Sequence, residues 1–322
     1  MASPNTAFSE LSSLTFRKVW KKQAVDNITN RNALYKWMCE KGNIKNTFDG
    51  GITIDIPLDF ATNGTYQRYS DWDLLNISQQ EVITTASFPW RQIAINVVAS
   101  GRELKINSGQ SKIGDLVAAR MKNAMRSFSN NFSFDMYSSG TLANQINGAQ
   151  SLVSDTGLGV VGGIDSSANA FWQNKFFSAA ANTVTPSATT IENNMMLPMW
   201  LLLDRGASDQ PDLIVADNNY YSFFEASQTS LKRYADSSNM SAGITGLKYK
   251  NATVVYDGNS GCPVNHMYMF NTQYIILASH RDADLTEAAE KTPINQDGVV
   301  YPVYWMGNLC ISNRAQQGVI IA

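Results

Sequence analysis

The chain contains few of the residues that catalytic and redox sites use most. Histidine, the commonest proton-transfer group at neutral pH, occurs twice in 322 residues, at His266 and His280. Cysteine occurs three times, at Cys39, Cys262 and Cys310, and these widely spaced, odd-numbered positions argue against a disulfide framework. The scarcity favours a structural role with buried free thiols, in a protein kept in a reducing compartment.

Long hydrophobic runs and an excess of one charge are also missing. No stretch approaches the roughly eighteen apolar residues of a transmembrane helix, and residues 1–6 lack the pattern of a secretory signal. We therefore expect no membrane partner, and a protein located in the cytoplasm or in an assembly formed there. With 25 basic and 27 acidic residues, the chain lacks the charge needed to grip nucleic acid through its phosphates.

The clearest pattern is a strict alternation of apolar and polar residues early in the chain. Apolar side chains occupy every second position from Ile52 to Phe60, which predicts a β-strand with one apolar face. A second run, Val82 to Val98, alternates as far as Trp90 and then shifts by one residue, which predicts a β-bulge. Together the runs predict a two-stranded arm about 30 Å long.

An apolar face of this length must be covered, because an exposed one would promote aggregation. One interpretation is an ordinary sheet inside the same domain. The other is an arm that lies over a neighbouring subunit.

Helical patterns occupy several other segments. Ser111 to Tyr137 has apolar residues at spacings of three and four, which predicts one helix of roughly 40 Å. Residues 8–41 read as a helix with an asparagine-rich interruption, and further helices are expected at 191–205 and 218–234. The predicted strands of the second half are 212–216, 247–256, 267–270, 274–278, 299–305 and 309–311.

No motif of the chain assembles a catalytic, cofactor or metal site. Gly157 to Gly162 matches a dinucleotide fingerprint, but no helix follows Gly162 and no acidic residue lies about twenty positions on. Cys262 and His266 have no second pair of ligands at metal-binding spacing. Residues 280–284, which contain His280 and two aspartates, read as a solvated polar loop. We therefore predict that the protein is not an enzyme.

The order of the segments is more informative than any motif. A helical arm, a long hairpin, an unusually long helix, a compact α+β region and returning strands follow one another, and this order resembles the major capsid proteins of tailed bacteriophages with the Hong Kong 97-like fold. Several stretches are similar to one family of these proteins: Asp212 to Tyr220, Gly261 to Tyr268, Trp305 to Leu309, Ser312-Asn313 and Gln317 to Val319.

The resemblance implies an α+β chain with five parts. Residues 1–49 correspond to an N-terminal arm, 50–98 to the extended E-loop hairpin, and 99–194 to a peripheral domain with its spine helix. Residues 195–279 correspond to the axial domain, and 280–322 to strands that return to the peripheral domain.

The resemblance also implies the function and the partners. Such proteins form pentamers and hexamers that close an icosahedral shell around double-stranded DNA, which is enclosed without sequence-specific binding. Scaffold, portal and cement proteins are the further partners expected, and the virion is the expected location. We expect subunit contacts at the apolar and aromatic positions of the E-loop: Ile52, Ile54, Ile56, Leu58, Phe60, Tyr66, Tyr69, Trp72, Phe88 and Trp90.

One departure from some members of this family is visible in the sequence. Those members join their subunits through an isopeptide bond from an E-loop lysine, but residues 50–104 contain no lysine. We therefore predict a shell without such cross-links, and a separate scaffold protein. Two alternatives stay open, namely a tail-tube or other virion component and a nucleotide-binding α/β enzyme built on Gly157–Gly162 and the strand at 212–216.

Overall fold

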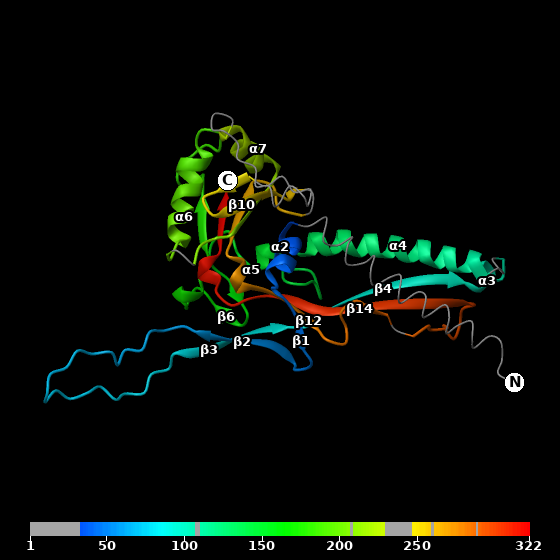
Figure 1. The fold of residues 1–322 in the computed structure, drawn as a ribbon, viewed down its shortest axis with the longest axis horizontal. Helices are drawn as coiled ribbons and strands as arrows, with labels where there is room; N and C mark the ends of the chain where they lie inside the picture. Colours follow the sequence, from blue (N-terminus) through cyan, green and yellow to red (C-terminus); the bar gives the residue numbers. More distant parts are fainter. Residues whose placement is uncertain (1–32, 107–109, 207–208, 229–246, 259–260, 288) are drawn as a thin grey trace.

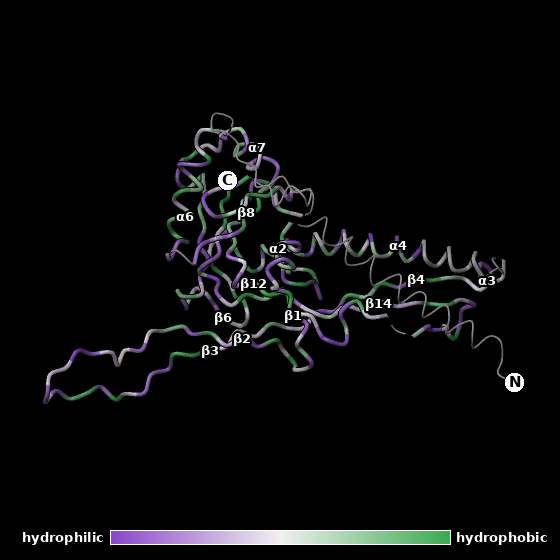
Figure 2. Tube along the Cα trace, in the orientation of Figure 1, coloured by the Kyte–Doolittle hydropathy of each residue, from purple (hydrophilic) through white to green (hydrophobic). Residues whose placement is uncertain are grey.

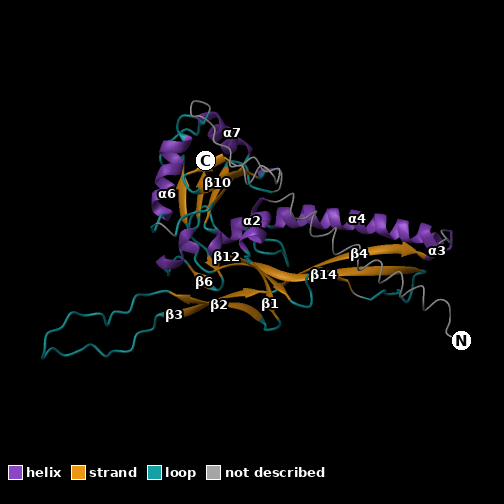
Figure 3. Cartoon of the chain, in the orientation of Figure 1, coloured by secondary structure: helices purple, strands orange, loops and turns teal. Residues whose placement is uncertain are grey.

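The computed structural model describes residues 33–106, 110–206, 209–228, 247–258, 261–287 and 289–322. The chain is an α+β protein, as the sequence predicts, with two larger sheets and a long two-stranded hairpin (Figures 1 and 3). The hairpin projects from one end of the molecule, and the longest helix with its underlying strands extends toward the opposite end (Figure 1). Most of the N-terminal helix predicted for residues 8–41 lies outside the described residues, whose first element is α2 (Ala33–Lys41).

The five-stranded sheet is built around one very long strand. β14 (Gly298–Ile311) pairs with β4 (Arg91–Ser100) along its first part and with β12 (Ile275–His280) along its second. Two short edge strands, β1 (Ile44–Phe48) and β13 (Thr286–Glu287), complete the sheet. The prediction of separate strands at 299–305 and 309–311 is therefore wrong. Gly307 does not end the strand, since its place in β14 is where the pairing partner changes from β4 to β12.

The predicted long helix is confirmed as α4 (Gln110–Asp135), which follows the short α3 (Gly101–Ile106) and lies along β4 and β14 (Figure 1). Met121, Met125, Phe128 and Phe132 are buried at spacings of four, three and four, the period of one helix face. The ring of Phe132 packs edge-on against Trp305 of β14, with centroids 5.2 Å apart. The apolar stripe therefore fixes the helix on the sheet.

The six-stranded sheet forms the second body of the molecule. Its central strand β8 (Leu213–Ala216) is buried along its whole length, as the sequence predicts. The neighbouring strands, in the order of the sheet, are β7 (Lys175–Ser178), β15 (Gly318–Ile321), β11 (His266–Phe270), then β8, β10 (Ala252–Tyr256) and β9 (Leu247–Tyr249). The resemblance assigned 280–322 to the peripheral domain, but β15 lies between β11 and β7 in this sheet.

Two helical segments pack on this second sheet. The helix predicted at 191–205 is confirmed as a π-helical turn, η2 (Ile191–Met196), followed by α6 (Leu197–Leu203). The helix predicted at 218–234 begins as α7 (Asn218–Ser227), and its remainder from 229 lies outside the described residues. Asp217 caps α7, since its carboxylate accepts a hydrogen bond from the Tyr220 N–H.

Short elements join the two bodies. They are α5 (Ala149–Leu152), the hairpin of β5 (Val160–Val161) and β6 (Ile164–Asp165), and the 3₁₀ turns η1 (Ala170–Trp172), η4 (Thr272–Tyr274) and η5 (Arg314–Gln316).

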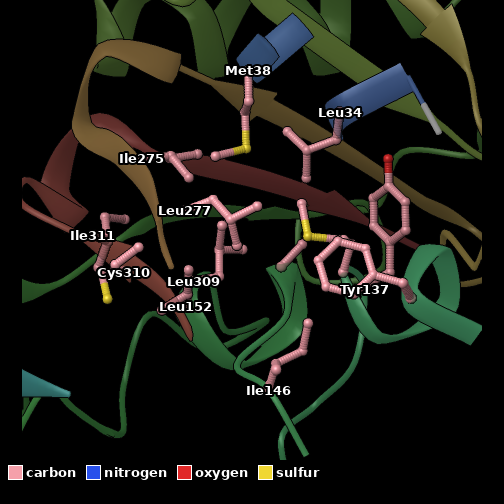
Figure 4. Packing of buried hydrophobic residues seen from close by; sticks show 14 of the residues in the cluster. Leu34, Met38, Tyr137, Ile146, Leu152, Ile275, Leu277, Leu309, Cys310 and Ile311 are labelled. Carbon is pink, nitrogen blue, oxygen red and sulfur yellow. The ribbon is translucent and has the colours of Figure 1, made fainter. Parts of the chain in front are cut away.

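The described residues form two hydrophobic cores, of which the larger includes residues of both bodies. The larger runs from α4 and the five-stranded sheet to α2, and Figure 4 shows Leu34 and Met38 of α2 near Ile275 and Leu277 of β12. The smaller core lies between the six-stranded sheet, η2, α6 and α7.

The predicted arm, β2 (Thr53–Asp59) and β3 (Ile83–Pro89), forms a separate two-stranded sheet. The one-residue shift at Trp90 is not a bulge, because the chain leaves this hairpin there and enters the five-stranded sheet as β4. The buried Asn308 side chain holds the corner by donating a hydrogen bond to the Pro89 carbonyl at 2.8 Å. A strand that changes sheets also changes the face that must be covered, which explains the shift in the apolar pattern.

Candidate functional site

The base of the β2–β3 hairpin is covered by its own chain. Ile54 and Phe88, which pair across the two strands, are each 1% exposed, and Leu58 is also buried. The prediction that a neighbouring subunit covers this face is therefore wrong for these three residues, which their own chain covers. Buried side chains have no surface left to offer a second subunit.

The cover comes from the β5–β6 hairpin and the turn that follows it. The Gly162 carbonyl accepts a hydrogen bond from the Ser87 N–H of β3 at 2.9 Å. Phe60, at the end of β2, packs against Phe171 of η1 with ring centroids 5.5 Å apart. Ile56 is half-buried against the same core. These contacts lie far from the hairpin in sequence, so the alternation alone could not reveal them.

Trp90 has a structural role in the corner between β3 and β4. Its indole N–H donates to the Gly51 carbonyl at 3.0 Å, and its ring packs edge-on against Phe48 and His280. Of the ten predicted contact residues, Trp90, Phe60 and Ile56 thus pack at least partly against their own chain.

The remaining predicted residues are exposed. Ile52 precedes β2, whereas Tyr66, Tyr69 and Trp72 lie on the loop 61–82, which joins β2 to β3 and projects away from both sheets (Figure 1). Trp72, at 98% exposure, has almost no cover from its own chain. The hydropathy colouring in Figure 2 shows hydrophobic stretches on this projecting part of the trace.

A second group of exposed apolar residues, which was not predicted from the sequence, lies in the same region. Leu74 and Ile77 are 96% and 93% exposed, and Leu75 and Ile83 are also exposed. Leu74, Leu75 and Ile77 follow no alternation and stand in a segment rich in Asp, Asn and Gln, which predicts no apolar face for them. Ile83 begins β3, on the opposite side from Val82 and Thr84 in the alternating run. Apolar residues without periodicity in a polar loop would have been the signal for them. Large exposed apolar sets of this kind mark interaction surfaces.

The glycine-rich segment does not form a nucleotide site. Gly162 and Gly163 have φ values of +59° and +76° and make the two-residue turn between β5 and β6, where both turn positions require positive φ. The segment therefore ends in a hairpin turn instead of a helix that could hold a pyrophosphate. The nucleotide-binding alternative therefore loses its phosphate-binding loop, and the strand at 212–216 alone does not support it.

The cysteine and histidine positions serve packing in this structure. Burial raises the pKa of the Cys262 and Cys310 thiols far above the ordinary value, which disfavours the reactive thiolate. His266 contacts Asp155 with Nε2 at 3.2 Å from the carboxylate, and its Nδ1 lies 2.8 Å from the Val264 carbonyl. Within the described residues, no group of three or more His, Cys, Asp and Glu side chains gathers as a metal site requires.

In the loop after β12, His280 and the two aspartates make structural hydrogen bonds. His280 Nδ1 accepts the Asp282 N–H at 3.2 Å, and Asp284 accepts a hydrogen bond from Asn46 of β1 at 2.9 Å. These contacts close a turn and tie it to the sheet edge. Among the helices of the described ranges, none is long and apolar enough to cross a membrane.

The chain was compared with known proteins by sequence and by structure. No family model matches the sequence, and no curated protein matches it. Solved structures do match. The cyanophage A-1(L) capsid asymmetric unit is similar with a TM-score of 0.60 and 14% identity, over 86% of this chain and 88% of that one.

Two further shells have the same fold. The capsid of a native GTA particle matches with a TM-score of 0.55 and 14% identity, over 88% of this chain and 89% of that chain. The holo-SrpI encapsulin complex from Synechococcus elongatus matches with a TM-score of 0.57 and 8% identity, over 89% of this chain and 86% of that chain. The predicted α+β, Hong Kong 97-like fold is therefore confirmed. At these identities the similarity concerns the fold alone.

Proposed function

We propose that this chain is a structural shell protein, the major capsid protein of a tailed bacteriophage. Copies of it assemble into pentamers and hexamers that close an icosahedral shell around packaged double-stranded DNA. Shells form in the host cytoplasm with the help of a separate scaffold protein and a portal. The proposal assigns the chain no catalytic step.

The observation that carries the proposal is the exposed apolar loop on a fold shared with shell subunits. The loop 61–82 and the adjacent Ile83 expose seven large apolar side chains that belong to neither core: Tyr66, Tyr69, Trp72, Leu74, Leu75, Ile77 and Ile83. Covering such side chains is worth on the order of 1.5–3 kcal/mol for each fully buried Leu or Ile. A second copy of the chain is the cover we propose, so that the loop acts as the E-loop of the shell.

The five-part division of the chain is retained as part of this proposal, with two adjustments. The hairpin part ends at Pro89, where the chain enters the five-stranded sheet. The last strand, β15, is counted with the axial body, whose sheet it joins. The N-terminal arm, residues 1–49, lies largely outside the described residues.

Electron microscopy of the full chain, expressed alone and together with its scaffold protein, tests the proposal. We expect closed shells of uniform size, whereas tubes would favour the tail-tube alternative and persistent monomers would contradict both. Trp72→Ser should leave a folded subunit that assembles poorly, because a polar group then enters the apolar contact. Trp72→Phe keeps an aromatic ring and should assemble.

The content of the shell needs its own test, because an encapsulin subunit has the same fold as the phage capsids. Particles purified from a phage lysate should contain double-stranded DNA that resists nuclease. Particles from infected cells that lack protected DNA at every stage would contradict the assignment to a phage head.

A further inference from the structure

The two legs of the loop 61–82 separate soon after the hairpin ladder ends. The last ladder pair is Asp59 with Ile83, and the Phe60 N–H then donates to the Val82 carbonyl at 2.9 Å. Farther out, the hydrogen bonds that join one leg to the other within residues 61–82 come from a single side chain, Gln67.

The Gln67 amide makes two bonds at once. Its Nε2 donates to the Leu74 carbonyl at 3.0 Å, and its Oε1 accepts the Asn76 N–H at 3.1 Å. A carbonyl and an N–H two residues apart are the groups that the edge of a strand offers to a neighbouring strand, and a primary amide supplies the matching donor and acceptor. The side chain thus takes the place of a missing strand residue.

This link closes the base of the loop tip. Beyond it, Ser70 and Asp73 make a tight turn, in which the Asp73 N–H donates to the Ser70 carbonyl and the Asp73 carboxylate accepts the Ser70 N–H. Tyr69 and Trp72 stand within this closed segment, and both are exposed. The amide therefore fixes the frame from which these rings are presented.

We infer that Gln67 is a positioning residue for assembly, which holds the tip in its docking conformation before it meets the second copy. The inference rests on the proposed function. Ordering a flexible loop at the moment of contact costs conformational entropy, and a loop that is already ordered avoids that cost. Gln67 would act through the conformation of Asn76 and Leu74, without needing a contact of its own with the neighbour.

The test compares Gln67→Met with Gln79→Met in the full chain. Both changes replace a glutamine of the same loop, half-buried Gln67 or exposed Gln79, with an apolar side chain of similar length. The Gln79 side chain takes no part in the link. The loss of two neutral hydrogen bonds predicts that Gln67→Met raises the protein concentration needed for half-maximal assembly about tenfold. Gln79→Met should assemble like the wild type.

Hydrogen exchange on unassembled subunits supplies the readout that separates positioning from direct contact. The Asn76 amide should exchange faster in Gln67→Met than in the wild type, with no change in the melting temperature of the subunit. Shell formation by Gln67→Met at the wild-type concentration would overturn the inference, and so would poor assembly with unchanged exchange at Asn76. If neither the wild type nor Gln79→Met forms shells, the proposed function itself fails.

Discussion

Arg314 is a fully buried guanidinium whose hydrogen-bond partners include no carboxylate. Its nitrogens donate to backbone carbonyls and one hydroxyl of the segment between α5 and β7: Leu152, Leu158, Gly159, Trp172 and Ser154. Burial lowers the pKa of Arg314 to about 10, which still leaves the group charged at neutral pH. One side chain from η5 therefore fixes the segment that covers the hairpin base.

Replacing this residue should destabilise the subunit strongly. Arg314→Met removes every donor and leaves several buried carbonyls without partners, so we expect a loss of about 3 kcal/mol or more. Urea unfolding of unassembled subunits measures it. Arg281→Met, at an exposed arginine, should stay within about 0.5 kcal/mol of the wild type. Equal effects of the two changes would show that the buried network contributes nothing.

Gly162 combines a backbone and a packing requirement. Its φ is +59°, and a Cβ atom there would lie 2.9 Å from the Cβ of Ala86 and 3.1 Å from the Phe88 ring. The neighbouring Gly163 also has positive φ, but a Cβ there would meet open space. The two glycines therefore separate the cost of the conformation from the cost of the close approach.

We predict different losses of stability for the two alanine variants. Gly163→Ala should cost about 1 kcal/mol, the penalty of a left-handed conformation. Gly162→Ala should cost roughly 1–3 kcal/mol more, because the hairpin base must move away. Thermal unfolding of the unassembled variants measures the difference. Identical melting temperatures would mean that β3 does not lie as close to the β5–β6 turn as the structure has it.

At the scale of elements, the Glu103 side chain of α3 joins β4 and α4. Ser100 and Glu103 form a reciprocal cap at the start of α3, since each side chain accepts the other residue's N–H at 3.3 Å. Glu103 also receives two hydrogen bonds from Arg120 of α4, at 2.7 and 2.8 Å. Mainly because of Arg120, the pKa of Glu103 falls from its ordinary 4.5 to about 2.

This lowered pKa predicts an acid-sensitive corner. The folded state holds the carboxylate ionised, so its stabilisation is complete above about pH 4.5 and is lost as the pH falls through 2. In Glu103→Gln the melting temperature should fall less steeply over this interval. Arg120→Met should flatten the same interval, since either change removes the pair. Parallel melting curves for wild type and both variants would contradict the assignment, although the expected effect is small because both side chains are partly exposed.

The change of sheet at Trp90 shows that the pairing of a strand depends on distant segments of the chain. The same alternating residues, Ile93 and Ile95, would extend the hairpin if β4 paired with β2, but β4 pairs with β14 and is covered by α4. Pairing partners are chosen by contacts between distant segments. A phase shift in the apolar pattern therefore marks where the strand pairing changes, but it does not distinguish a β-bulge from a change of sheet.

At the scale of the whole molecule, the described chain has two packed bodies and one long extension that packs only at its base (Figure 1). The base of the hairpin is part of the larger core, whereas the loop 61–82 makes no such contact with either core. Such a shape suits a protein that completes its packing in an assembly.

The composition of the extension predicts how the proposed shell would be held together. Residues 50–104 contain no lysine, so an isopeptide bond from this part of the chain has no amine donor. Purified particles boiled in detergent should therefore run as one band near 35.5 kDa. A ladder of covalent multimers under reducing conditions would refute this prediction.

The sequence by itself determined the elements whose patterns are local. The long helix, the buried strand at Leu213–Ala216 and the alternating strand at Thr53–Asp59 follow from periodicity, and their order indicated the fold. Tertiary structure alone decided which apolar faces are covered within the subunit. Phe88 lies close to Gly162, far along the chain, whereas Trp72 and Leu74 are almost fully exposed. Burial of this kind depends on long-range packing that no local period encodes.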